Sequence, residues 1–161
     1  MTTRNFLRSA FWIGVYFALA TAPLFAMLIG PTPLGRGFWR EFSVGIGFAG
    51  LSMMGLQFFL TGRFRNITAP YGIDVVYHFH RNVSLIAFFF ILLHAAIIPI
   101  SSPETLILLN PASAPWWMAV GAAGFLAFAI VIATSLYRIK LGLFYERWRG
   151  IHGYISVVAV T

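Results

Sequence analysis

Long apolar runs alternate with short polar and basic segments along this chain. A helix of about 20 apolar residues is needed to cross the roughly 30 Å of hydrocarbon in a bilayer. The runs that reach this length are Ala10 to Ile29, Phe42 to Leu60, about Asn82 to Ile100, and Trp116 to Leu136. A fifth run begins near Ile151 and continues to Thr161. The pattern predicts an all-α membrane protein, a multi-span helical bundle with four complete transmembrane helices plus the start of a fifth.

Composition narrows the class further. The chain has 161 residues, of which 60% are hydrophobic and only 9% are charged, whereas a soluble domain is about 25% charged. This excludes a soluble enzyme, a nucleic-acid-binding module and a disordered chain. No nucleic-acid partner is expected in spite of the net charge of +7, because membrane proteins gather Lys and Arg on their cytoplasmic side. The chain has no cysteine, so a redox centre must use other ligands.

The basic residues also predict the orientation of the chain. With the N-terminus in the cytoplasm, Arg36 and Arg40 are the only cations on the far side. The cytoplasmic segments then hold the other nine, namely Arg4, Arg8, Arg63, Arg65, Arg81, Arg138, Lys140, Arg147 and Arg149. The positive-inside rule therefore favours a cytoplasmic N-terminus.

Histidines supply the candidate chemistry, because ionisable side chains inside a span are costly and are functional candidates by default. His80 and His94 are 14 residues apart on one expected helix. At 100° per residue this spacing returns to within about 40° of the same face, about 21 Å further along. The two imidazoles cannot share one ion at that distance, but each could hold a cofactor near one membrane face.

The other histidines differ in position. His78 is about 160° from His94 around the helix and is expected at the junction between the inner loop and the helix. His152 begins the fifth run, at a depth similar to that of His80, so these two form a candidate axial pair. His94 then has no partner in this chain, and we expect its partner some 13 or 14 residues after His152, beyond Thr161.

Two imidazoles from neighbouring helices, without cysteine and with almost no carboxylate, suit b-type haem. Zinc favours three or four clustered ligands. A proton relay usually includes intramembrane Asp or Glu, and none of the four acidic residues falls within an expected span. Spacing alone leaves a second interpretation open, in which these histidines are hydrogen-bonded packing residues.

Arg81 directly follows His80 at the expected cytoplasmic edge. Its guanidinium suits bidentate pairing with a carboxylate such as a haem propionate. An arginine that only sets the topology is an equally good interpretation.

Three stretches of sequence resemble the transmembrane domain of the ferric reductase and NADPH oxidase superfamily. They are Gly72-Ile-Asp-Val-Val-Tyr-His-Phe-His80-Arg81 with His94 fourteen residues after His80, the stretch Trp148-Arg-Gly-Ile-His152, and Leu60-Thr-Gly-Arg63 at the end of the second run. The resemblance covers residues 1–161 as spans one to five of a six-span domain, so the chain resembles the N-terminal portion of such a domain.

The resemblance implies two stacked b-type haems, each held by one histidine from span three and one from span five. Carried onto this chain, His80 and His152 would hold the inner haem, and His94 would hold one side of the outer haem. FAD and NAD(P)H are implied as cofactors of the family, but their sites are not in this chain. The lipid bilayer and a cytosolic flavin-bearing domain or reductase are the implied partners, with other membrane subunits as further candidates.

We therefore expect a multi-pass protein of the bacterial inner (plasma) membrane that transfers electrons from a cytosolic flavin/NAD(P)H donor to ferric iron or dioxygen on the far side. This chain alone is not expected to suffice as an enzyme. One alternative is a haem subunit that feeds a separate periplasmic reductase. Another is a non-catalytic structural subunit of a larger membrane complex.

Overall fold

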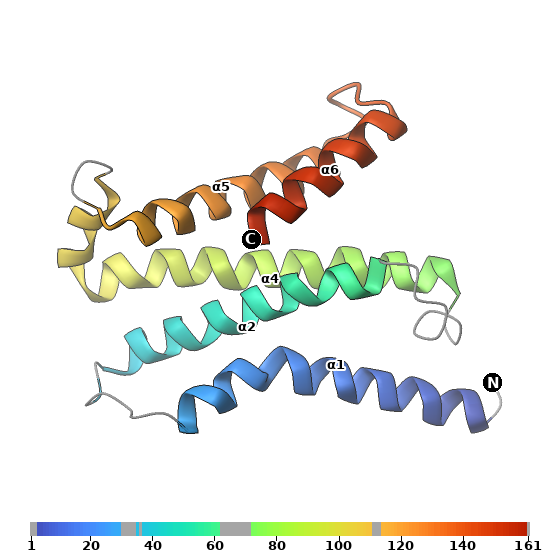
Figure 1. The fold of residues 1–161 in the computed structure, drawn as a ribbon, viewed down its shortest axis with the longest axis horizontal. Helices are drawn as coiled ribbons and strands as arrows, with labels where there is room; N and C mark the ends of the chain where they lie inside the picture. The colour runs from blue at the N-terminus through green and yellow to red at the C-terminus, as the bar shows by residue number, and fades with distance from the viewer. Residues whose placement is uncertain (1–2, 30–34, 36, 62–71, 111–113, 161) are drawn as a thin grey trace. The chain divides into compact units, whose positions relative to one another are not determined.

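The computed structural model describes residues 3–29, 35, 37–61, 72–110 and 114–160. Within these ranges the chain is helical and contains no strand, which confirms the all-α class. The helices are α1 (Thr3–Ile29), α2 (Phe38–Thr61), α4 (Ile73–Ser101), the 3₁₀ helix η1 (Pro103–Leu109), α5 (Trp116–Leu136) and α6 (Tyr145–Val160). Figure 1 shows them in chain order.

Three of these helices are long and apolar enough to cross a membrane, namely Phe6–Ile29, Ile73–Ser101 and Trp116–Leu136. They coincide with the first, third and fourth expected spans, so the chain is an integral membrane protein. The second expected span forms α2, whose 24 residues correspond to a length of about 36 Å. That α2 and α6 also enter the bilayer stays a prediction.

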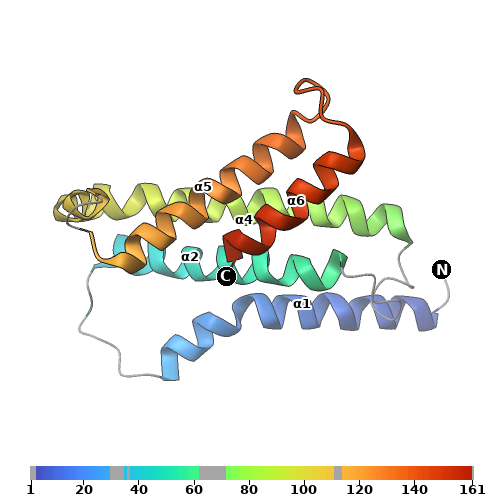
Figure 2. The same cartoon turned by 45° about the horizontal axis from the view of Figure 1, so that its top comes forward.

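The contacts divide the chain into two units, Met1–Ser101 and Ser102–Thr161. In the first unit α2 packs against both α1 and α4, most extensively against α4, and it lies between them in both views (Figures 1 and 2). Small and polar residues of α2, among them Ser43, Gly50 and Gln57, are buried. On α4 the buried residues are Val76, Val83 and Ala87. Small side chains let neighbouring helix backbones approach closely, as is common between membrane helices.

The second unit is built on a hairpin of α5 and α6, which pack against each other. Phe128 and Val131 of α5 are buried. The connecting turn includes Gly142 at φ +63°, a backbone conformation that glycine adopts without steric cost. Close to this turn, the Arg138 guanidinium carbon lies 5.6 Å from the centre of the Trp148 ring, a distance typical of a cation–π contact.

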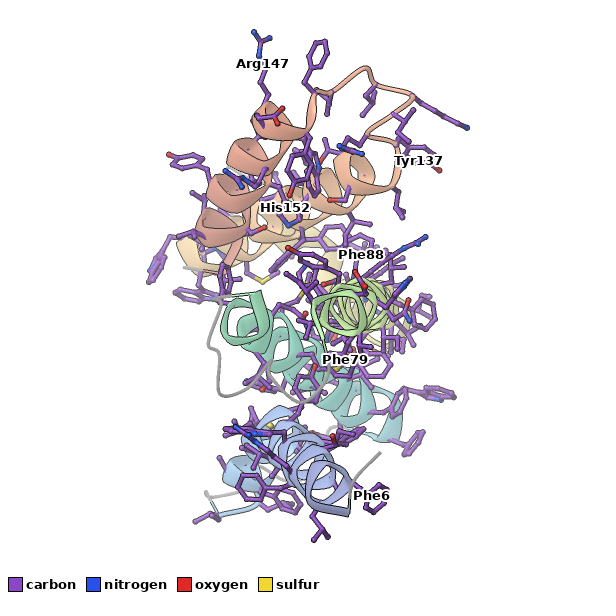
Figure 3. The ribbon with its side chains drawn as sticks, turned by 90° about the vertical axis from the view of Figure 1, so that its right-hand side faces the viewer. Phe6, Phe79, Phe88, Tyr137, Arg147 and His152 are labelled. Carbon is purple, nitrogen blue, oxygen red and sulfur yellow. The ribbon has the colours of Figure 1, made fainter. Side chains whose placement is uncertain are left out.

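The outer faces of the helices are apolar. Phe6 of α1, Phe89 of α4 and Trp116 of α5 are all more than half exposed, and Figure 3 shows Phe6 pointing away from its helix neighbours. Large apolar side chains at such positions suit contact with lipid.

Four helices begin earlier than the apolar runs that predicted them, and the cause is the same in each. Helix α1 begins at Thr3 rather than Ala10, and α2 begins at Phe38 rather than Phe42. Helix α4 begins at Ile73 rather than near Asn82, so His78 lies within the helix and not at its junction with a loop. Helix α6 begins at Tyr145 rather than near Ile151. Hydropathy marks only the apolar part of a helix, whereas backbone hydrogen bonding continues through the polar turns that precede it. The residues Arg36, Arg63 and Arg65, and the middle of the inner loop, lie outside the described ranges.

Candidate functional site

His80 of α4 is hydrogen-bonded to Gln57 of α2. The His80 Nδ1 atom lies 2.8 Å from the Gln57 Oε1 atom, and Gln57 is only 5% exposed. The Gln57 amide nitrogen donates to the Met53 carbonyl at 3.4 Å, which directs the amide oxygen toward the imidazole. An amide oxygen only accepts hydrogen bonds. The His80 Nδ1 atom must therefore carry a proton and donate it.

His94 of α4 has a different kind of partner, because its acceptor belongs to the main chain. The His94 Nδ1 atom lies 2.9 Å from the Ser43 backbone oxygen. The Ser43 hydroxyl donates to the His94 backbone oxygen at 3.1 Å and lies 3.1 Å from the His94 Nδ1 atom. Because a carbonyl oxygen is an acceptor only, the His94 Nδ1 atom is also a donor.

The two contacts share one spacing. Ser43 and Gln57 are 14 residues apart on α2, and His80 and His94 are 14 residues apart on α4. Since α2 and α4 pair the first member of one set with the last member of the other, the helices run antiparallel. Each separation corresponds to about 21 Å of helix. The sequence-based expectation of two histidines on one face of a helix is therefore matched by two hydrogen-bond acceptors on the facing helix.

His152, in the second unit, is also hydrogen-bonded through its Nδ1 atom, in this case to a serine hydroxyl of α5. Its Nδ1 atom lies 3.1 Å from the Ser135 hydroxyl oxygen, and Figure 3 shows its side chain between α6 and α5. The Ser135 hydroxyl donates its proton to the Val131 carbonyl at 2.6 Å. The Ser135 oxygen is thus an acceptor toward His152, and the His152 Nδ1 atom is the donor.

Trp148 lies one helical turn before His152, and the two ring centres are 5.0 Å apart. The indole nitrogen of Trp148 is buried and has no hydrogen-bond partner among the described residues. A buried N–H group without an acceptor is costly. The Trp148 N–H is therefore suited to donate to an acceptor that lies outside the described part of the chain.

In each of these histidines the protonated nitrogen is Nδ1, so the lone pair of the neutral ring is on Nε2. A histidine that binds a metal commonly donates its other ring N–H to a carbonyl, carboxylate or water. No group of three or more His, Cys, Asp or Glu side chains gathers in the described ranges. The donor set therefore fits single imidazoles that bind the iron of haem, and it does not resemble a zinc centre.

Arg81 is a predicted cofactor-binding residue, whereas His78 was expected only at the junction between the inner loop and the helix. Arg81 and His78 line a shallow open pocket at the start of α4, together with Asp74 and Tyr77, and both are exposed. A role for Arg81 toward a haem propionate stays a prediction.

Sequence reasoning missed the histidine partners Ser43, Gln57 and Ser135. A signal for two of them exists, because Ser43 and Gln57 are two of the three polar residues in the run from Phe42 to Leu60, and they repeat the 14-residue spacing of the histidines. Polar side chains inside spans commonly mark function or helix–helix hydrogen bonds. Ser135 carries no comparable signal, since serine often bonds to its own helix backbone.

Comparison with known proteins adds one finding. Residues 46–161 match the family model described as ferric reductase like transmembrane component. The matched region includes Gln57 and the histidines His80, His94 and His152, whereas Ser43 precedes it. Searches of curated proteins and of solved structures found no match.

Proposed function

Since the chain belongs to the family of ferric reductase-like transmembrane components, we propose that it transfers electrons across a membrane with b-type haem as the carrier. The donor in this proposal is a cytosolic flavin reduced by NAD(P)H, and the acceptor on the far side is ferric iron or dioxygen. The membrane is the bacterial inner membrane. The observation that carries the proposal is that His80 and His94 each donate from Nδ1 to an acceptor on α2.

The histidines that donate from Nδ1 are the residues that would hold haem in this proposal. His80 and His152 would hold the iron of the inner haem through Nε2, and His94 would hold the iron of the outer haem from one side. When bound, haem supplies reversible one-electron chemistry at its iron. Hydrogen bonds from Nδ1 fix the orientation of each imidazole and increase its basicity.

The two α4 histidines also determine where redox centres can lie along the helix. Their spacing of 14 residues places the two ligands about 21 Å apart along the helix axis. We propose that α2 and α4 cross the membrane together. His80 then lies in the inner half of the bilayer and His94 in the outer half. Apolar side chains exposed on α1, α4 and α5 would face lipid and exclude water from the helices.

In this proposal, electrons enter on the side of the membrane where the basic residues gather. Arg138, Lys140, Arg147 and Arg149 surround the turn between α5 and α6 and the first turns of α6, and Figure 3 shows Arg147 pointing away from the helix pair. On the expected cytoplasmic side, these cations would attract an acidic partner surface or anionic lipid. Trp148 Nε1 and Arg81 are the proposed donors to haem propionates on this side.

The test is a dithionite-reduced minus oxidised absorption spectrum of the full-length protein in membranes. We expect the absorption bands of b-type haem, and a loss of part of that signal in each of His80→Ala, His94→Ala and His152→Ala. His78→Ala is the matched control, because His78 lies on the same helix but is exposed away from the α2 contacts, and its spectrum should equal that of the wild type. A correctly inserted wild-type protein without haem bands would refute the proposal.

A further inference from the structure

The ligand histidines of α4 differ in the nature of their acceptors. His80 donates to the side-chain amide of Gln57, whereas His94 donates to the Ser43 main-chain oxygen. A substitution can remove or change the first acceptor. It cannot remove the second, because every residue has a backbone carbonyl oxygen.

We propose that Gln57 is a positioning residue that sets the reduction potential of the haem bound by His80. This inference rests on the proposed function. It assigns to α2, a helix without a histidine, control over one of the two redox centres. Ser43 would orient His94 through its backbone oxygen at 2.9 Å and through its hydroxyl, which lies 3.1 Å from the same Nδ1 atom, so the haem bound by His94 would not depend on Gln57.

The chemical reason lies in the imidazole. Hydrogen-bond donation from Nδ1 moves electron density toward Nε2 and makes the imidazole a stronger ligand. A stronger donor ligand stabilises ferric iron relative to ferrous iron and lowers the reduction potential. Loss of the Gln57 acceptor should therefore raise the reduction potential of the haem bound by His80. It should also leave the orientation of the His80 imidazole less restricted.

The geometry supports a specific contact rather than general helix packing. The 2.8 Å separation of His80 Nδ1 from Gln57 Oε1 is short for an N–H···O hydrogen bond. Gln57 is buried at 5% exposure, so bulk water has little access to replace it. The second bond of the amide, to the Met53 carbonyl, keeps the oxygen and not the nitrogen toward the histidine.

The experiment compares three variants of the full-length protein by potentiometric titration of the haem absorbance, with haem content per protein as a second readout. Gln57→Met keeps the length of an unbranched side chain but removes the acceptor. Gln57→Glu keeps an oxygen that can accept from Nδ1. Ser52→Ala is the matched control, because the Ser52 hydroxyl on the same helix donates to the Leu19 carbonyl at 3.0 Å and not to a histidine.

We expect Gln57→Met to raise one of the two midpoint potentials. A tenfold change in the reduction equilibrium, taken from the low end of the effect of such partners on metal sites, corresponds to about 59 mV for a one-electron couple. Gln57→Glu should leave that potential equal to or below the wild-type value, and Ser52→Ala should change neither potential. If Gln57→Met loses one haem while Gln57→Glu retains both, the acceptor is required to hold the ligand, which also supports the proposal.

Other outcomes would overturn it. Unchanged potentials in Gln57→Met with full haem content would show that the amide does not act on the ligand. A loss of haem in both Gln57 variants, or an equal shift of both potentials, would indicate a packing role alone. These results differ from a failure of the proposed function, in which the wild-type protein itself would contain no haem.

Discussion

Gly47 of α2 and His94 of α4 lie in direct contact, because a β-carbon built on Gly47 would be 2.9 Å from both Cγ and Nδ1 of the His94 ring. Real β-carbons do not approach neighbouring atoms so closely. The absence of a side chain at position 47 is therefore a condition for the observed imidazole orientation. The hydrogen bond from His94 to the Ser43 backbone, one helical turn earlier on α2, depends on that orientation.

The variant Gly47→Ala should displace the His94 imidazole and reduce the haem signal assigned to His94, while the other haem signal persists. Overpacking of this kind costs about 1–3 kcal/mol. Gly55→Ala is the matched control, because a β-carbon at Gly55 on the same helix would meet no atom within 4 Å. Difference spectra of the two variants provide the measurement, and identical spectra would contradict the expectation.

Gly50→Ala should act on the helix pair as a whole. A β-carbon at this position would lie 2.9 Å from Ile91 Cγ1 and 3.0 Å from the Ala87 backbone oxygen. A backbone carbonyl of a helix cannot rotate away, so α2 and α4 must separate. We expect a loss of about 1–3 kcal/mol in unfolding free energy and weaker retention of both haems. Thermal unfolding with spectroscopic detection of haem measures both effects. A loss confined to one haem would argue against this mechanism.

Ser135→Ala should weaken the binding of the haem that His152 holds, since it removes the acceptor of the His152 Nδ1 proton. Loss of such a partner typically costs 10- to 100-fold in metal affinity, so we expect a decrease of about that size. Thr134→Val is the control, because the Thr134 hydroxyl bonds only to the Ile130 and Val131 carbonyls among the contacts described. Haem content per protein after purification distinguishes the two variants.

Trp148→Phe tests whether the buried indole N–H donates to a haem propionate. Phenylalanine keeps an aromatic ring beside His152 but has no donor. A hydrogen bond to a charged acceptor contributes about 1.5–3 kcal/mol, so haem affinity should fall by roughly tenfold to a hundredfold. Titration of haem into protein made in haem-deficient cells measures this. Equal affinity in the variant would show that the indole nitrogen has another role.

The sequence predicted much of the fold because hydropathy depends on residue type alone. The runs ending at Ile29, Ile100 and Leu136 correspond to helices that the structure also identifies as candidate spans. The early turns of α4 and α6 could not be predicted in this way. They contain polar residues such as Asp74 and Glu146, so hydropathy does not distinguish them from loops.

The candidate site was predictable in part. The spacing of His80 and His94 on one helix face depends only on helix geometry, and both histidines do face α2. Their partners depend on the register between two helices, which no single helix determines. Gln57 could have been suspected as a polar residue in an apolar run, but its pairing with His80 required the structure.

The matched spacing on α2 and α4 also restricts how this protein can change in length. Insertion of one residue between Ser43 and Gln57 would rotate one of them by about 100° relative to the other and lengthen the helix by about 1.5 Å. At least one histidine would then lose its acceptor. Only an equal insertion between His80 and His94 could restore both contacts, so the two segments are expected to gain or lose residues together over evolutionary time.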